Sequence, residues 1–144
     1  MGSCLLDSNI YVYLFDDTSE HHPKVLDALE RLIKKDTQFV ITHHVLEEFI
    51  FVQTKLIRRA NLKSDYAKLQ NELDKISSFA GNFIEPSEDF QFVKRVVEVM
   101  RIFSIEANDA YILTLILEHD VELIFTFDQK LQKVARKLKI KLVE

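Results

Sequence analysis

The chain of 144 residues contains very little glycine, with Gly2 and Gly81 as its only two. A Walker-type phosphate-binding loop or a dinucleotide-binding fingerprint needs several glycines close together, because the backbone itself must approach the phosphate. Two glycines so far apart can form neither motif. Any phosphate chemistry in this protein must therefore depend on side chains.

Cysteine and long hydrophobic runs are also scarce. The single cysteine, Cys4, rules out an intramolecular disulfide and a cysteine-rich zinc module, and it favours a reducing compartment. The apolar run at 110–117 is too short to span a bilayer, and acidic residues follow it directly. With no targeting segment visible, we expect a soluble cytoplasmic protein that has no membrane partner.

The formal net charge is −4, which taken alone argues against a nucleic-acid partner. The charges are unevenly distributed, however. Residues 102–129 carry six acids and no base, whereas residues 130–144 carry six bases and one acid. Segregation of this kind is typical of a protein with one surface for cations and another for a polyanion. Ordinary solvated helix faces are the alternative explanation.

Short apolar runs alternate along the chain with amphipathic stretches of helical periodicity. The predicted strands cover residues 4–6, 38–41, 83–84, 123–127 and 140–143. The predicted helices cover residues 8–15, 21–35, 43–59, 62–79, 89–103, 106–119 and 129–138, with Thr42 as a helix cap and Gly81 as a helix stop. Strands separated by helices predict a single three-layer α/β domain over residues 1–144, with a mostly parallel sheet of about four or five strands.

Acidic residues occur where the predicted strands end. Asp7 ends the first strand, and Asp128 follows the fourth. Glu47 and Glu48 lie early in the helix after the second strand, and Asp109 lies early in the helix that leads into the fourth. Ligands of open parallel sheets bind outside the carboxyl ends of the strands. We therefore expect three or four of these carboxylates to converge at one edge of the sheet.

Carboxylates that converge repel one another and raise each other's pKa unless a cation lies between them. A hard divalent ion with oxygen ligands, Mg²⁺ or Mn²⁺, suits such a cluster and would activate water and neutralise a phosphate. Each acid also has an ordinary explanation; Asp109, for example, is favoured near a helix start by the helix dipole. Asp7 is harder to explain in this way, because a carboxylate next to a buried strand needs a partner.

Four short motifs, in order along the chain, resemble those of PIN domains. They are Leu5-Leu6-Asp7-Ser8-Asn9, Thr42 with Glu48 six residues later, Asn108-Asp109-Ala110, and Thr126-Phe127-Asp128. The resemblance covers residues 7–143, and its four motifs together are more specific than any one of them. The compact length is similar to that of stand-alone PIN toxins of the VapC type, which pair with small antitoxins in bacteria and archaea.

The resemblance implies a PIN-like fold and a metal-dependent endoribonuclease, the toxin of a type II toxin–antitoxin pair, that hydrolyses RNA phosphodiesters with metal-activated water. It implies that Asp7, Glu48, Asp109 and Asp128 are the catalytic ligands of Mg²⁺ or Mn²⁺, with motif spacing alone favouring Glu48 over Glu47. Thr126 would support the site by hydrogen bonding, and Asn9 would orient ligands or water. Glu106 is either an auxiliary acid or a helix-start charge. The implied partners are an RNA substrate, a small antitoxin and a second copy in a homodimer.

Basic residues are candidates for contacts with RNA phosphates. They are Lys55, Arg58, Arg59 and Lys63, and the set from Lys130 to Lys141. The same residues can equally be solvated helix faces or an antitoxin contact. The phenylalanines lie mainly at core spacing, so the sequence predicts no base-stacking platform.

Two other functions stay open at this point. An aspartate-based phosphatase or phosphotransferase would use a related sheet, although Asn9 stands where such enzymes usually carry a second aspartate. A catalytically silent PIN-like module that binds RNA or protein is the other alternative, and the presence of all four acids argues against it.

Overall fold

Five short parallel strands form one sheet at the centre of the computed structural model, which describes residues 2–60, 66–87 and 89–144. The strands are β1 (Ser3–Leu6), β2 (Gln38–Ile41), β3 (Asn82–Phe83), β4 (Leu123–Phe125) and β5 (Lys141–Leu142). Their order is β3-β2-β1-β4-β5, and every described neighbouring pair is parallel. The order reverses between β1 and β4, so these two strands lie side by side at the centre.

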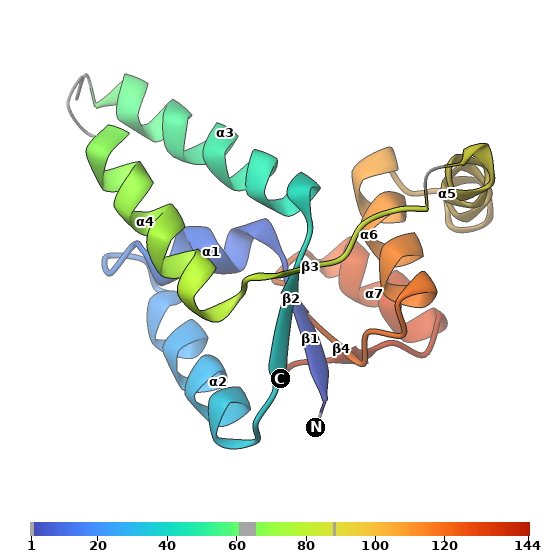
Figure 1. Cartoon of the computed structure of the whole chain (residues 1–144), viewed down its shortest axis with the longest axis horizontal. Helices are drawn as coiled ribbons and strands as arrows, with labels where there is room; N and C mark the ends of the chain where they lie inside the picture. Colours follow the sequence, from blue (N-terminus) through green and yellow to red (C-terminus); the bar gives the residue numbers. More distant parts are fainter. Residues whose placement is uncertain (1, 61–65, 88) are drawn as a thin grey trace.

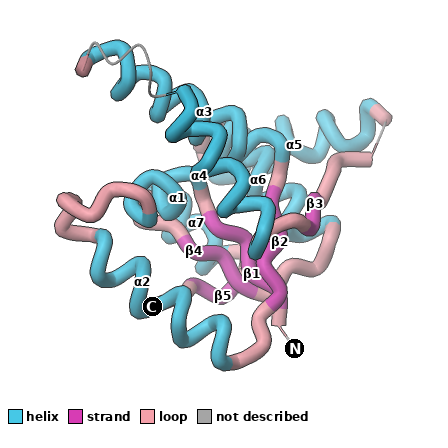
Figure 2. Tube along the Cα trace, turned by 60° about the vertical axis from the view of Figure 1, so that its left-hand side comes forward, coloured by secondary structure: helices cyan, strands magenta, loops and turns pink. Residues whose placement is uncertain are grey.

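Helices cover both faces of the sheet (Figure 1). On one side lie α1 (Ser8–Leu14), α2 (His22–Lys34), α3 (His43–Arg59) and α4 (Tyr66–Phe79); on the other lie α5 (Phe90–Phe103), α6 (Ala107–Glu118) and α7 (Gln129–Lys137). Figure 2 shows the strands enclosed between these helical layers. The predicted three-layer α/β architecture is confirmed. None of the described helices has the length and apolar character that a membrane crossing requires.

The core forms where the central strands meet the helices. Leu5 and Leu6 of β1 and Ile124 of β4 are fully buried, as expected for strands of a parallel sheet that is covered on both faces. Cys4 is paired in register with Phe39 of β2 and Leu123 of β4 and is also fully buried. It is therefore a core residue, as its place in an apolar run predicts.

Several element boundaries differ by one or two residues from those predicted, among them those of two strands. The fourth strand ends at Phe125 rather than Phe127, because the backbone N–H of Phe127 donates to the Asn9 side chain, 3.4 Å away, instead of to a strand. The third strand is Asn82–Phe83 rather than 83–84.

The prediction that a helix stops at Gly81 agrees with the end of α4 two residues earlier, but Gly81 is not left-handed, because no described glycine has a positive φ. Helix α4 ends at Phe79, and residues 62–65 of the predicted helix lie outside the described residues. The positive φ angles belong instead to Asp36, Ser104, Asp120 and Lys139, and Ser104 caps α5 in this conformation. In a chain so poor in glycine, other residues adopt the left-handed conformation at helix ends.

Candidate active site

Two aspartates lie at the carboxyl ends of the central strands. Asp7 follows β1 and caps α1, accepting a hydrogen bond of 2.8 Å from the backbone N–H of Ser8. Asp128 comes after β4 and caps α7, accepting bonds from the N–H groups of Lys130 and Leu131 at 2.9 and 3.2 Å. Because β1 and β4 are neighbours, both carboxylates lie at the point where strand order reverses, the usual ligand position in such sheets.

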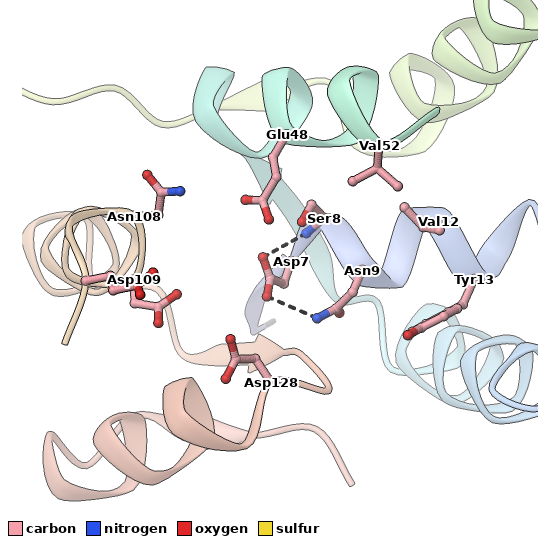
Figure 3. Close-up of a pocket in the computed structure, with 11 residues that line it drawn as sticks. Asp7, Ser8, Asn9, Val12, Tyr13, Glu48, Val52, Asn108, Asp109 and Asp128 are labelled. Carbon is pink, nitrogen blue, oxygen red and sulfur yellow. Dashed lines mark hydrogen bonds between the residues drawn. The ribbon is translucent and has the colours of Figure 1, made fainter. Parts of the chain in front are cut away.

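Two further acids reach the same place from opposite helical layers. Glu48 lies in the second turn of α3, whose start is capped by Thr42, with the Thr42 hydroxyl oxygen accepting from the N–H of Val45 at 3.0 Å. Asp109 lies in the first turn of α6. The side chains of Asp7, Glu48, Asp109 and Asp128 line one pocket of about 320 Å³ (Figure 3).

The pocket is also lined by two residues for which the sequence offered a supporting role, Asn9 and Glu106. Glu106 is exposed at the N-cap of α6 without a side-chain capping bond. Glu47 is exposed, and among the described residues it does not line the pocket. The structure thus brings Glu48, but not its neighbour, to the other acids.

Thr126 connects the two aspartates from beneath the pocket. Its hydroxyl donates to Asp7 Oδ2 at 2.6 Å and accepts from the backbone N–H of Asp128 at 3.0 Å. Asn9 Nδ2 lies 3.4 Å from both Asp7 Oδ2 and Thr126 Oγ1. Asp7 is only 6% exposed and Thr126 only 3%. The carboxylate of Asp7 is therefore fixed by its neighbours rather than free to rotate.

Burial and mutual repulsion disfavour negative charge in this pocket. Burial raises the pKa of Asp7; hydrogen bonds from Thr126 and Ser8 lower it, and Glu48 and Asp128 raise it further. Burial raises the pKa of Asp109 to about 6, with added repulsion from Asp128, Asp7, Glu106 and Glu48. The anionic forms of Asp7 and Asp109 are therefore disfavoured in this pocket, and a bound cation would stabilise them.

The donor set suits a hard divalent cation, because it consists of carboxylate oxygens and lies around a common pocket. Across the described ranges, however, no group of three or more His, Cys, Asp or Glu side chains lies close enough together to hold a metal ion as placed. Figure 3 shows Glu48 and Asp128 on opposite sides of Asp7, with Asp109 across the pocket. Unscreened carboxylates repel one another, and the three that are partly exposed must turn inward to share an ion.

The comparison with family models gives a match to the PIN domain over residues 4–137. The chain belongs to the PIN domain family. The matched range includes all four motifs quoted from the sequence. A comparison with curated proteins found no match.

Solved structures show the same fold. VapBC2 from Rickettsia felis, bound to a DNA fragment from their promoter, is 21% identical, with 97% of this chain and 96% of that chain covered and a TM-score of 0.68. FitAcB from Neisseria gonorrhoeae is 16% identical (98% and 96% covered, TM-score 0.67). VapC20 from Mycobacterium tuberculosis, a Sarcin-Ricin loop cleaving toxin, is 16% identical (91% and 94% covered, TM-score 0.63). At these identities the likeness establishes a common fold.

The candidate RNA-binding residues of this PIN domain do not gather at the pocket. Lys55, Arg58, Arg59 and Lys130 are exposed, and none of them lines the pocket in the part of the chain described. Arg58 is ten residues beyond Glu48 on α3, or about 15 Å along the helix axis. Lys130 is the nearest in sequence to a site residue, and Lys63 lies outside the described residues.

Sequence reasoning missed several residues that line the pocket of the PIN domain. They are Ser8, Val12, Tyr13, Val52 and Asn108. Helical spacing could have indicated three of them, because Val12, Tyr13 and Val52 each follow another lining residue by four positions. Asn108 belongs to a quoted motif but had no role, and in the structure its Oδ1 lies 2.9 Å from His44 Nε2 on α3.

We expect Asp109 to make the metal-free PIN domain less stable as the pH rises from about 4 to about 6. The pKa of its carboxyl is raised from an ordinary value of 3.8 to about 6 in the folded protein, so in this interval the unfolded chain binds fewer protons. The free energy of unfolding then falls as the pH rises. Urea unfolding of the wild type and Asp109→Asn in a chelator, below and above this interval, measures the effect.

The free energy of unfolding of Asp109→Asn, compared with that of the wild type, should be larger above this pH interval than below it. Added Mg²⁺ should stabilise the wild type more than the variant. An effect of the substitution that is independent of pH would show that the carboxylate is not destabilised by its surroundings.

Proposed function

We propose that this PIN domain is a metal-dependent endoribonuclease, and that it is the toxin of a type II toxin–antitoxin pair. The observation that carries the proposal is the pocket itself, where four of the five lining carboxylates come from four separate parts of the chain. One of the four, Asp7, is buried and fixed by hydrogen bonds. A buried carboxylate among other carboxylates destabilises the fold unless it has a partner, which favours a functional explanation for the cluster.

Asp7, Glu48, Asp109 and Asp128 would hold Mg²⁺ or Mn²⁺. When bound, the ion supplies neutralisation of the phosphodiester charge and activation of water. Asp7 presents an oxygen in a fixed position, because Thr126 and Ser8 bond to its two oxygens. Asn9 orients that carboxylate from the side through its amide, which lies 3.4 Å from Asp7 Oδ2. Glu106, at the rim, adds negative charge to the same pocket.

The partners are proposed from the likeness to toxin–antitoxin structures. VapBC2 is such a neighbour, and VapC20 is described as a Sarcin-Ricin loop cleaving toxin. Exposed apolar side chains on α5, among them Phe90 (81% exposed) and Val97 (56% exposed), would be covered by a small antitoxin or by a second copy in a homodimer. A toxin of this kind acts on cytoplasmic RNA.

The proposal is tested by incubating the purified protein with RNA and either Mg²⁺, Mn²⁺ or a chelator. We expect cleavage that requires the divalent ion. Glu48→Gln should reduce the rate by at least about tenfold, because it removes a charge from the ion-binding set. Glu47→Gln is the matched control and should stay within about twofold, because the Glu47 side chain is exposed outside the pocket.

Cleavage that persists in excess chelator, or equal effects of the two substitutions, would contradict the proposal. A covalent phosphoaspartate trapped on Asp7 would instead support the phosphatase or phosphotransferase. RNA binding without cleavage under any metal condition would support the silent module.

A further inference from the structure

Three aromatic rings lie together beside the acidic pocket, and one of them, Tyr13, lines it. Tyr13 comes from α1, His21 is the N-cap residue of α2, and Phe127 lies between Thr126 and Asp128. The ring centroids are 4.6 Å apart for Tyr13 and His21, 4.7 Å for His21 and Phe127, and 5.6 Å for Tyr13 and Phe127. We call these three residues the aromatic cluster. All three residues are half-buried.

The aromatic cluster is tied directly to the acidic site. Tyr13 follows Asn9 by one helical turn, lines the pocket, and is drawn beside Asn9 in Figure 3. The backbone N–H of Phe127 donates to Asn9 Oδ1 at 3.4 Å. His22 Nδ1 donates to the carbonyl oxygen of Tyr13 at 2.8 Å. These bonds hold the backbone at Tyr13 and Phe127 in place beside the carboxylates before any ligand arrives, which lowers the entropic cost of binding.

Packing against the core does not fully explain the aromatic cluster. Tyr13 and Phe127 contact the core at one side, but Tyr13 also forms one wall of an open pocket whose other walls are mainly polar or acidic. The nearby carboxylates repel a phosphate group that lies against the Tyr13 ring. They do not repel an uncharged nucleobase in the same position. An aromatic ring offers it a face for stacking.

The ligand chemistry that matches this arrangement is an unpaired nucleobase whose phosphodiester lies among the acids. We propose that Tyr13, supported by His21 and Phe127, is the stacking surface for a nucleobase next to the cleaved phosphodiester. This proposal rests on the ribonuclease function proposed above. RNA-binding proteins commonly recognise single-stranded segments by stacking their bases on aromatic side chains. Stacking accepts every base, so the subsite selects unpaired RNA rather than a sequence.

The core spacing of the phenylalanines predicts no stacking platform. Of the eleven, four are buried and four, Phe127 among them, are partly buried against the core, whereas Phe51, Phe83 and Phe90 are exposed. Phe127 differs because it lies beyond the end of β4, where its ring turns toward Tyr13 and His21. The other two members are a tyrosine and a histidine, so the spacing of the phenylalanines does not reveal them.

The test compares binding of two end-labelled probes by fluorescence anisotropy in Ca²⁺ buffer. One is a short single-stranded oligoadenylate, and the other is an abasic ribose–phosphate oligomer of the same length and charge. We expect the wild type to bind oligoadenylate roughly tenfold more tightly than the abasic oligomer. Tyr13→Ala should lose most of this difference by weakening oligoadenylate binding alone, and Tyr13→Phe should keep it. Tyr66→Ala is the matched control, since Tyr66 is a 47% exposed tyrosine on α4.

Metal-dependent RNA cleavage is measured on the same samples, so the two proposals can fail separately. If the wild type cleaves RNA but Tyr13→Ala keeps its preference for the oligomer with bases, the stacking subsite is overturned and the ribonuclease function stands. If base-dependent binding disappears in Tyr13→Ala although no variant cleaves RNA, the subsite is supported and the ribonuclease function is not. Equal weakening of both probes by Tyr13→Ala overturns the subsite as well.

Discussion

Asp7→Asn is expected to reduce metal-dependent RNA cleavage by at least about a hundredfold while the fold is kept. The substitution removes a charge worth several kcal/mol at a divalent-metal site, and each 1.4 kcal/mol corresponds to about a factor of ten in rate. Asparagine has almost the same shape as aspartate, and its Oδ1 can still accept from the backbone N–H of Ser8. Single-turnover cleavage with saturating Mg²⁺ measures the loss, and a circular dichroism spectrum like that of the wild type controls for folding.

The same substitution should have the opposite effect on stability. Burial is the largest cause that raises the pKa of Asp7, so the ionised side chain destabilises the folded state above that pKa. At neutral pH and without metal, we expect Asp7→Asn to have a larger free energy of unfolding than the wild type. Added Mg²⁺ should narrow or reverse this difference, because the ion stabilises only a protein that binds it. An Asp7→Asn protein that is both active and less stable would show that Asp7 is a structural capping residue alone.

The sequence predicted the position of the acidic cluster because parallel strands place their carboxyl ends at one edge. Asp7 and Asp128 follow adjacent central strands, and this juxtaposition depends only on strand order. The choice between Glu47 and Glu48 could not be made in this way. Successive residues on a helix are separated by only about 100°, and both flank the apolar stripe of α3. The packing of α3 against α1 decides that Glu48 faces the pocket.

The aromatic cluster could not be predicted, because it depends on where β4 ends. The apolar run continues through Phe127, and periodicity therefore assigns the whole run to a strand. In the structure, Thr126 bonds to Asp7 and the N–H of Phe127 bonds to Asn9, contacts between residues more than a hundred positions apart. These contacts end the strand early and turn Phe127 toward Tyr13. Contacts so distant in sequence leave no local pattern by which they can be recognised.

The second large effect is a loss of stability expected when Phe49, which packs α3 against α1, is replaced by alanine. Phe49 is fully buried, with its ring centroid 6.2 Å from that of Tyr11 and 6.0 Å from that of Phe15. Phe49→Ala should lower the free energy of unfolding by about 3–5 kcal/mol, the usual cost of a large cavity in a core. This is a large part of the total stability of a typical domain, about 5–15 kcal/mol. Urea unfolding followed by circular dichroism measures the change.

Phe51 provides the matched control, because it lies on the same helix but is 60% exposed. Phe51→Ala should change the free energy of unfolding by less than about 0.5 kcal/mol. Phe49 is also the residue after Glu48, so a cavity beneath it loosens the helix turn that carries this acid. We therefore expect folded Phe49→Ala protein, at low temperature and with Mg²⁺, to lose cleavage activity as well, while Phe51→Ala keeps it. Full activity in folded Phe49→Ala protein would show that Glu48 does not depend on this packing for its position.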